Sequence, residues 1–361
     1  MSQTFSPTLS RRGLLTLAGI GWLAPIGQLL ARQAERSREP AKSLILLWLD
    51  GGPSQLETFD PHPGSKISGG TGAIPTRVEG VQLASGYERL AEQMDKVTLI
   101  RSMVSKEGDH ERGTYLMKTG YRPDPTIEHP SIGAICCHEL PIDGAEVPRH
   151  ISILTGQWPS RGGYLGGAYD AFQVGDPRGK LPDMVASAPA PREAQRIADL
   201  DILDRSFARG RSGRVRATLH RELLNRARTM MTSEQLAAFD VSQEPLSVLA
   251  EYGDSAFGRG CLAARRLIEV GVRFFELTLG GWDSHVNNHE IHAKRASELD
   301  PAFAALLQDL ARRDRLRDTV VLCCGEFGRT PIVNVAGGRD HWTNGWSLAL
   351  AGGGIRSGLV L

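Results

Sequence analysis

The stretch that decides the fold class is Ser43-Leu44-Ile45-Leu46-Leu47-Trp48-Leu49-Asp50-Gly51-Gly52-Pro53. Its first part is almost entirely apolar, so a strand formed by it would be buried on both faces. Such a run is typical of a central strand in a parallel sheet that is covered by helices on both sides. The two glycines and the proline then end the strand. Asp50 is therefore expected at the carboxyl end of a central strand, where open α/β sheets bind their ligands.

Strand and helix patterns alternate from this run to the end of the chain. Apolar runs predict further strands at residues 97–100, 150–154, 272–279, 319–324 and 346–351, and helices are expected at 87–94, 111–118, 131–140, 254–270 and 298–313. Residues 60–80 and 155–190 are rich in glycine and proline and are expected as loops. A charged stretch at about 190–245 predicts a helical insertion. The alternation predicts one α/β domain over residues 43–361, with a mostly parallel central sheet and helices on both faces.

The N-terminal segment has the pattern of an export signal. Arg11 and Arg12 precede a moderately apolar run at residues 14–30, which is typical of a twin-arginine signal peptide. We expect the signal peptide at residues 1–34 and a linker at 35–42. A membrane anchor is the alternative, but the run is short and broken by Gly and Pro. The mature protein is then expected in the periplasm or outside the cell, with no stable membrane span.

Composition limits the classes of partner. The 361 residues include 42 Lys and Arg against 41 Asp and Glu, so no basic excess is present for binding nucleic acid. The five cysteines are an odd number, which excludes a complete disulfide framework. The chain stops in the apolar run Gly358-Leu359-Val360-Leu361, so we expect the domain to be incomplete at its C-terminus. The oligomeric state is left open by the sequence.

Acidic side chains follow three of the predicted strands. Asp50, Asp283 and Glu326 each come just after an apolar run, and the carboxyl ends of parallel strands meet at one edge of a sheet. His285 and His341 occur in the same segments. Mixed carboxylate and imidazole ligands suit zinc, manganese or iron, whereas carboxylates alone favour magnesium or calcium. We therefore expect a divalent metal site, with zinc, manganese, calcium or magnesium as the candidate ions.

A series of ordered motifs resembles the family called domain of unknown function 1501, whose members are exported by the twin-arginine route and are related to sulfatases and alkaline phosphatases. The motifs are Leu47-Trp48-Leu49-Asp50-Gly51-Gly52-Pro53-Ser54-Gln55, Asp109-His110-Glu111-Arg112-Gly113, Lys118-Thr119-Gly120-Tyr121, His129-Pro130-Ser131, Gly163-Tyr164-Leu165-Gly166, Gly281-Trp282-Asp283-Ser284-His285, Gly325-Glu326-Phe327-Gly328-Arg329-Thr330-Pro331 and Gly338-Arg339-Asp340-His341-Trp342. The resemblance covers nearly everything from residue 43 onward. It implies an alkaline-phosphatase-like sheet and a two-metal phosphatase site.

The resemblance also implies ligands for the metals. Asp50 is similar to the first-strand metal aspartate, and Glu326 stands where the superfamily has the aspartate of a late Asp-His pair. The next residue is Phe327, so one histidine ligand is absent. Asp283 with His285 resembles the Asp and His of the other metal, with His289 as an alternative. His341 is similar to the last metal histidine.

The nucleophile is the largest departure from the superfamily pattern. Phosphatases have Ser or Thr where this chain has His110. The motif with Cys or Ser that sulfatases have at this place does not occur here either. His110 could be a nucleophile, a metal ligand or a structural residue. It lies at the start of a predicted helix, whose dipole favours an anion and disfavours a protonated imidazole. Arg112 and Arg329 are candidates for binding the anion, because guanidinium groups match phosphate or sulfate.

Two functions follow as hypotheses. The first is a metal-dependent hydrolase of phosphate or sulfate esters, which acts on a small molecule or a polysaccharide. The alternative is a protein that has lost its nucleophile and binds a polysaccharide or a cell-surface partner without catalysis. The retained acids and histidines favour the enzyme, whereas His110 and Phe327 favour the binding protein.

Overall fold

A computed structural model describes residues 41–361, apart from 141–143, 179–180, 182–187 and 210–219. The predicted signal peptide and nearly all of the linker lie outside the described residues. Residues Ala41–Leu361 form one compact unit. None of the described helices is both long enough and apolar enough to span a bilayer.

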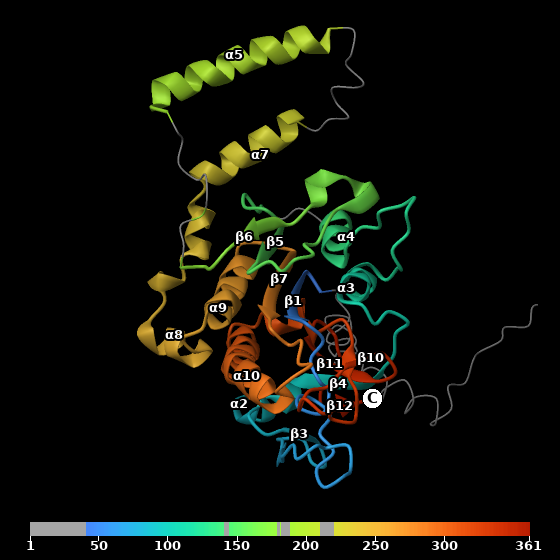
Figure 1. The fold of residues 1–361 in the computed structure, drawn as a ribbon. Helices are drawn as coiled ribbons and strands as arrows, with labels where there is room; N and C mark the ends of the chain where they lie inside the picture. The colour runs from blue at the N-terminus through green and yellow to red at the C-terminus, as the bar shows by residue number, and fades with distance from the viewer. Residues whose placement is uncertain (1–40, 141–143, 179–180, 182–187, 210–219) are drawn as a thin grey trace, which may run out of the picture. The chain divides into compact units, whose positions relative to one another are not determined.

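The centre of the fold is an eight-stranded sheet with the order β12-β4-β11-β8-β1-β7-β5-β6 (Figure 1). The strands are β1 (Ser43–Asp50), β4 (Val97–Met103), β5 (His150–Ile153), β6 (Phe172–Val174), β7 (Phe274–Gly280), β8 (Thr319–Cys324), β11 (Trp346–Gly352) and β12 (Leu359–Val360). Strand β1 is parallel to both neighbours, β7 and β8. Only β11 is antiparallel to its neighbours, β4 and β8, within this sheet. The predicted mostly parallel sheet is confirmed.

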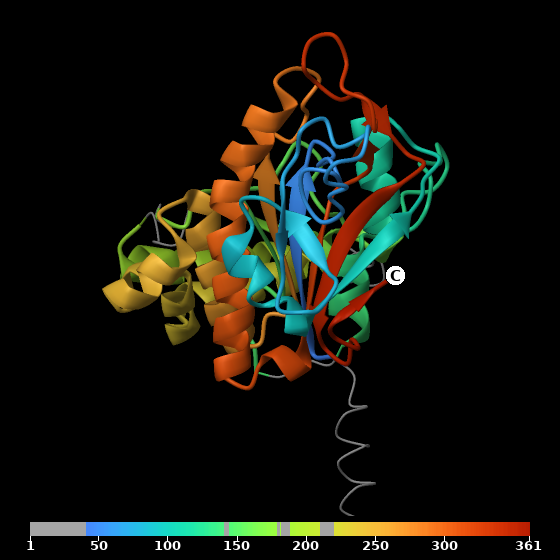
Figure 2. The same cartoon turned by 90° about the horizontal axis from the view of Figure 1, so that it is seen from below.

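The two faces of β1 explain why its sequence is apolar throughout. Ile45, Leu47 and Leu49 are fully buried in the larger core, which includes side chains of α9 (Ala256–Glu269) and α10 (Asn288–Arg312). Leu46 and Trp48 belong to a second core on the other face. That second core also contains residues of α3 (His110–Thr119) and α4 (Ile132–Glu139). Helices therefore cover both faces, as the views in Figures 1 and 2 also show. Each buried aliphatic side chain contributes about 1.5 to 3 kcal/mol by leaving water.

The predicted helical insertion contains α5 (Ala190–Ala208) and α7 (His220–Thr232). Short 3-10 helices at Glu234–Phe239 and Val241–Gln243 and the helix α8 (Leu246–Tyr252) connect it to α9. All five cysteines are free, in agreement with the odd count.

Two helices and several short strands differ from the sequence predictions. Helix α10 begins at Asn288 and not at residue 298, because His292 and Ala296 supply the buried face of its first turns in place of large aliphatic residues. Helix α2 is only Glu88–Ala91, and a separate 3-10 turn follows at Met94–Lys96. Short strands also occur in segments expected as loops, at β2 (Ala73–Pro75), which pairs with β3 (Gln82–Ala84), and at β6. These strands are only three residues long, so they leave little periodic signal.

Candidate metal centre

The site lies at the carboxyl ends of β1, β7 and β8, where three chain segments come close together. Gly51 follows β1 with φ of +114°, and a Cβ atom at this position would lie 2.6 Å from the backbone nitrogen of Asp283. The backbone N–H of Trp282 donates a hydrogen bond to the carbonyl oxygen of Asp50. A glycine is therefore required here, both for the backbone conformation and for the approach of the Asp283 loop.

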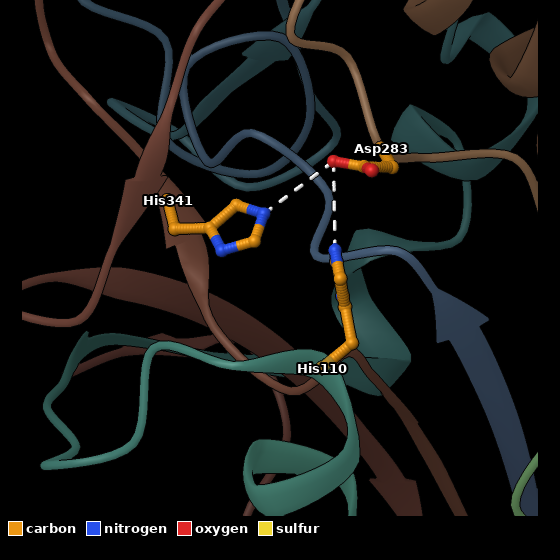
Figure 3. A group of neighbouring side chains, drawn as sticks. All are labelled: His110, Asp283 and His341. Atoms are coloured by element: carbon orange, nitrogen blue, oxygen red, sulfur yellow. Dashed lines mark ion pairs between the residues drawn. The ribbon is translucent and has the colours of Figure 1, made fainter.

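Three imidazoles surround one carboxylate oxygen. The Oδ1 atom of Asp283 lies 3.5 Å from Nε2 of His110, 3.2 Å from Nε2 of His285 and 3.5 Å from Nε2 of His341. The Nε2 atoms of His285 and His341 are 3.0 Å apart. His110 is the first residue of α3, His285 lies in the loop after β7, and His341 begins β10 (His341–Trp342). Figure 3 shows one carboxylate oxygen of Asp283 facing a ring nitrogen of both His110 and His341.

Each of these imidazoles is held through its other ring nitrogen. Nδ1 of His110 donates to Oε1 of Glu326 at 2.6 Å, and Nδ1 of His285 donates to Oδ1 of Asp340 at 2.9 Å. Nδ1 of His341 donates to the carbonyl oxygen of Gly108 at 2.6 Å. A carbonyl oxygen can only accept, which fixes the tautomer of His341. All three side chains therefore direct Nε2 toward the same point.

Glu326 is completely buried and interacts directly with His110. Burial raises the pKa of Glu326, and the nearby charge of Asp50 raises it further. The hydrogen bond to Glu326 raises the pKa of His110. At neutral pH we place the shared proton on Nδ1 of His110, because a carboxylate paired with an imidazole N–H is the stable arrangement in such a pair. The hydrogen bond to Glu326 therefore acts against the helix dipole, and the unprotonated Nε2 expected for His110 stays a prediction.

Arg329 positions Asp283. Its guanidinium is fully buried, and Nη2 donates to Oδ1 of Asp283 at 2.6 Å. Nε donates to the carbonyl of Gly52 at 2.8 Å, and the other hydrogen bonds go to the carbonyls of Gly51 and Arg339. Burial opposes ionisation of Asp283, but Arg329, His110 and His285 together outweigh it, so the pKa of Asp283 is lowered. The carboxylate therefore stays charged beside the imidazoles.

Two of the predicted site residues lie apart from this cluster. Asp50 ends β1 and accepts a hydrogen bond from Nε1 of Trp48 at 3.3 Å, with Gly156 nearby. Arg112 forms an ion pair with Glu107, with Nε 2.7 Å from Oε2. The roles of Asp50 as a metal ligand and of Arg112 and Arg329 in anion binding stay predictions.

Phe327 occupies the place where the superfamily pattern has a histidine. Its ring is fully buried, and its centroid lies 5.0 Å from that of His110 and 4.5 Å from that of His341. Among the described residues, the group of side chains suited to holding a metal is His110, Asp283 and His341, whose ligand atoms lie within 4.8 Å of one another. His285 lies close to two members of this group, Asp283 and His341, but is not part of it. The geometry thus supports one donor cluster at this place.

Sequence reasoning missed two residues that support the site. Asp340 accepts the hydrogen bond that holds His285. The sequence signal that could have identified Asp340 is its position directly before His341. His292 is buried, and its Nε2 accepts a hydrogen bond from the backbone N–H of Ser54, in the loop that follows β1, at 2.8 Å. The alternative ligand, His289, instead lies with its Nδ1 3.5 Å from Oε1 of Glu57.

Solved structures of several enzymes are similar to the chain. The alkaline phosphatase from the Antarctic bacterium TAB5 is 15% identical with a TM-score of 0.37, and the match covers 89% of this chain and 94% of that one. The lipoteichoic acid synthase LtaP from Listeria monocytogenes is 8% identical with a TM-score of 0.40, covering 88% and 67%. The PsFucS1 sulfatase from Pseudoalteromonas sp. is 12% identical with a TM-score of 0.39, covering 93% and 66%.

No curated protein matches the chain. A family model described as a protein of unknown function, DUF1501, matches residues 41–361. This match includes the strands, the three histidines and the acids described above. The chain therefore belongs to the DUF1501 family.

Proposed function

We propose that the chain is an exported, metal-dependent hydrolase of phosphate or sulfate esters. The observation that carries the proposal is the convergence of three imidazole Nε2 atoms on one carboxylate oxygen. The resemblance of the sequence motifs to the alkaline phosphatase and sulfatase superfamily gives the class of ester. Arg11 and Arg12 before an apolar run support export by the twin-arginine route to the periplasm or beyond.

The donor group His110, Asp283 and His341 fits a tetrahedral ion whose fourth position is open. Bonds of about 2.0 to 2.1 Å place tetrahedral ligand atoms roughly 3.3 Å apart, and catalytic sites keep a position for water or substrate. The Oδ1 atom of Asp283 lies 3.5 Å from Nε2 of both His110 and His341, and Nε2 of His285 lies 3.2 Å from the same oxygen. In addition, Nε2 of His110 is buried without a hydrogen-bond partner in the described part of the chain. A set of imidazole and carboxylate ligands favours zinc, manganese or iron over magnesium or calcium.

The surrounding residues have the roles that metal sites need. Carboxylates and carbonyls that hold the Nδ1 atoms of ligating histidines fix the ring orientation and strengthen the ligand. Glu326, Asp340 and Gly108 do this here, and Arg329 holds Asp283. Burial lowers the pKa of His341, which keeps its Nε2 free of a proton.

The chemistry proposed is hydrolysis by water. When bound, a divalent ion polarises an ester oxygen and makes a water molecule more acidic. His110 stands at the position of the superfamily nucleophile, but its Nε2 faces Asp283 within the donor cluster. We therefore assign His110 to ion binding and not to formation of a covalent intermediate. Glu326 keeps the imidazole of His110 oriented during the reaction.

The second candidate is a protein that binds a polysaccharide or a cell-surface partner without catalysis. Two observations favour it. The residue directly after Asp109 is His110 and not Ser, Thr or Cys, and Phe327 stands where the superfamily has a histidine ligand. The two candidates share the fold and can share the metal. They differ in whether the bound ion supports turnover of an ester.

The test is metal analysis of the purified protein together with assays on aryl phosphate and aryl sulfate esters. We expect about one ion of zinc, manganese or iron per chain, and turnover of either the phosphate or the sulfate ester. Replacement His341→Ala should reduce metal affinity by about 10- to 100-fold or more, with a parallel loss of turnover. The matched control His289→Ala, close in sequence to His285 but outside the cluster, should keep both. Stoichiometric metal without turnover would favour the binding protein, and wild-type protein that takes up no metal would contradict the proposal.

A further inference from the structure

The loop at residues 104–109 connects β4 to His110, the first residue of α3. Five of its six residues are exposed or half-buried, and the exception is Glu107, which is 3% exposed. A buried carboxylate is costly unless its charge is paired, so an exposed loop has no ordinary reason to bury one. The burial of Glu107 therefore directs attention to its partners.

Two arginines hold the carboxylate of Glu107. Nε of Arg112 donates to Oε2 at 2.7 Å, and Nη2 of the same guanidinium donates to Oε1 at 3.2 Å. Nε of Arg122 also donates to Oε1. Arg112 lies in the first turn of α3, whereas Arg122 follows the C-terminal end of that helix. Charge-assisted hydrogen bonds, bidentate in the case of Arg112, thus tie the loop to segments at both ends of α3.

The same loop determines where two of the donor side chains lie. The carbonyl oxygen of Gly108 accepts a hydrogen bond from Nδ1 of His341 at 2.6 Å. His110 directly follows Asp109, whose Oδ1 accepts from a backbone N–H in the first turn of α3. Figure 3 shows His110 and His341 on the two segments that the bond to Gly108 joins. A shift of the loop would therefore move both imidazoles relative to Asp283.

The remaining bonds of the loop fix its beginning. The N–H of Ser105 donates to the carbonyl of Thr343 at 2.8 Å, and Oγ of Ser105 accepts from the N–H of Glu107 at 3.1 Å. Gly108 comes directly after Glu107 and has no side chain that could hold it in place. The position of its carbonyl oxygen therefore depends on the anchoring of Glu107.

We propose that Glu107, held by Arg112 and Arg122, is a positioning residue that fixes the carbonyl of Gly108 and thereby the ring of His341 in the metal centre. The importance of this anchor for turnover rests on the metal-dependent function proposed above, whereas its effect on the ring does not. Arg112 acts through Glu107 and needs no contact with the substrate, which is a different role from the anion binding expected from the sequence.

The test measures the tautomer of His341 in metal-free protein, so that positioning is separated from metal uptake and turnover. Long-range ¹H–¹⁵N spectra of the labelled chain are recorded with a chelator at about pH 8, where histidines are uncharged, and His341→Gln assigns the signal. We expect the parent to carry the proton on Nδ1, because a carbonyl oxygen can only accept. Glu107→Ala should shift the ring toward the Nε2–H form, and Arg122→Gln should do so less, since Arg112 remains.

Zinc affinity, measured by competition with a chelator, is the second readout. Loss of the groups that orient a ligating histidine typically weakens metal binding by about 10- to 100-fold, and we expect a change of that size for Glu107→Ala. Glu244→Ala is the matched control, because Glu244 also pairs with two arginines, Arg265 and Arg266, but lies in the segment before α8. It should keep the parent tautomer of His341 and the parent zinc affinity.

The outcomes separate the two proposals. If the parent lacks the Nδ1–H form of His341, or if Glu107→Ala keeps it, the positioning role is wrong, whether or not the chain binds zinc or hydrolyses an ester. If Glu107→Ala loses this form and Glu244→Ala keeps it, the role holds, even where the parent takes up no metal and the proposed function fails. Should thermal unfolding show that Glu107→Ala does not fold, Arg112→Gln and Arg122→Gln decide in the same assay. A parent tautomer in both arginine variants contradicts the role, and its loss in either supports it.

Discussion

His292 is a histidine kept neutral by its surroundings. Its Nδ1 donates to the carbonyl of Asn288 at 2.9 Å, and its Nε2 accepts from Ser54, so both ring nitrogens are used in the uncharged form. The ring also packs against Trp282, with centroids 5.3 Å apart. Burial lowers the pKa of His292 to about 4. Protonation would break the bond from Ser54 and place a charge on a buried ring.

This arrangement predicts a loss of stability in acid. Because the folded pKa lies below the unfolded value of about 6.5, the unfolded chain takes up the proton first, and stability falls as pH drops from 6.5 to 4. The expected contribution is about 3 kcal/mol over that window. Urea unfolding across this pH range should show a shallower loss for His292→Gln than for the parent. The exposed His138→Gln is the control, and equal slopes for all three proteins would refute the assignment.

The sequence identified most of the residues in the donor cluster, because a strand that ends in an acid leaves a readable pattern. Asp283 and Glu326 were predicted in this way, and His285 and His341 were predicted from the motifs that resemble the family. The pattern could not separate ligands from the residues that hold them, since Glu326 bonds to a histidine and Arg329 to a carboxylate. Whether a residue is a ligand or holds a ligand depends on which atom of its side chain faces the centre. The spacing of residues along the chain does not give that orientation.

Helix α2 depends on α10 for its N-terminal hydrogen bonds. Both oxygens of Asp300 accept from backbone N–H groups of α2, at 2.7 Å from Leu90 and 3.1 Å from Arg89. Asp300→Ala would leave these two N–H groups without their partner and should lower the free energy of unfolding by about 2 kcal/mol. Urea denaturation measures this change. The neighbouring Glu298→Ala loses only a pair with Arg295 on the same helix and should cost well under 1 kcal/mol, so equal effects would show that the cap is unimportant.

Elements with a continuous apolar sequence were the easiest to predict. Strand β8 has the predicted bounds, since Thr319–Cys324 is buried or half-buried along its whole length. The start of α10 was missed because its first turns bury a histidine and an alanine. The burial of His292 is set by Ser54 and Trp282, and Ala296 lies beside Gly86, which is tertiary information.

Metal binding should stabilise the whole chain, because the donor residues come from α3, the loop after β7 and β10. An ion that binds only the folded state at a free concentration of 100 times its Kd adds about 2.7 kcal/mol. For a chain of this size, that corresponds to a rise in Tm of roughly 5 °C. Calorimetry with zinc and with a chelator should show this rise for the parent and its loss for His341→Ala. A rise of equal size in both proteins would place the stabilising ion elsewhere.

The wide separation of the donor residues also affects when the site can form during synthesis. His110 and His341 are 231 residues apart, from 341 − 110. At about 5 to 20 residues per second, the ribosome needs roughly 10 to 50 seconds between them. The nascent chain therefore has no complete donor set until residue 341 has been made, and the compartment in which the chain folds decides which ion it meets. If the predicted twin-arginine route is used, folding precedes export, and the ion is drawn from the cytoplasmic pool.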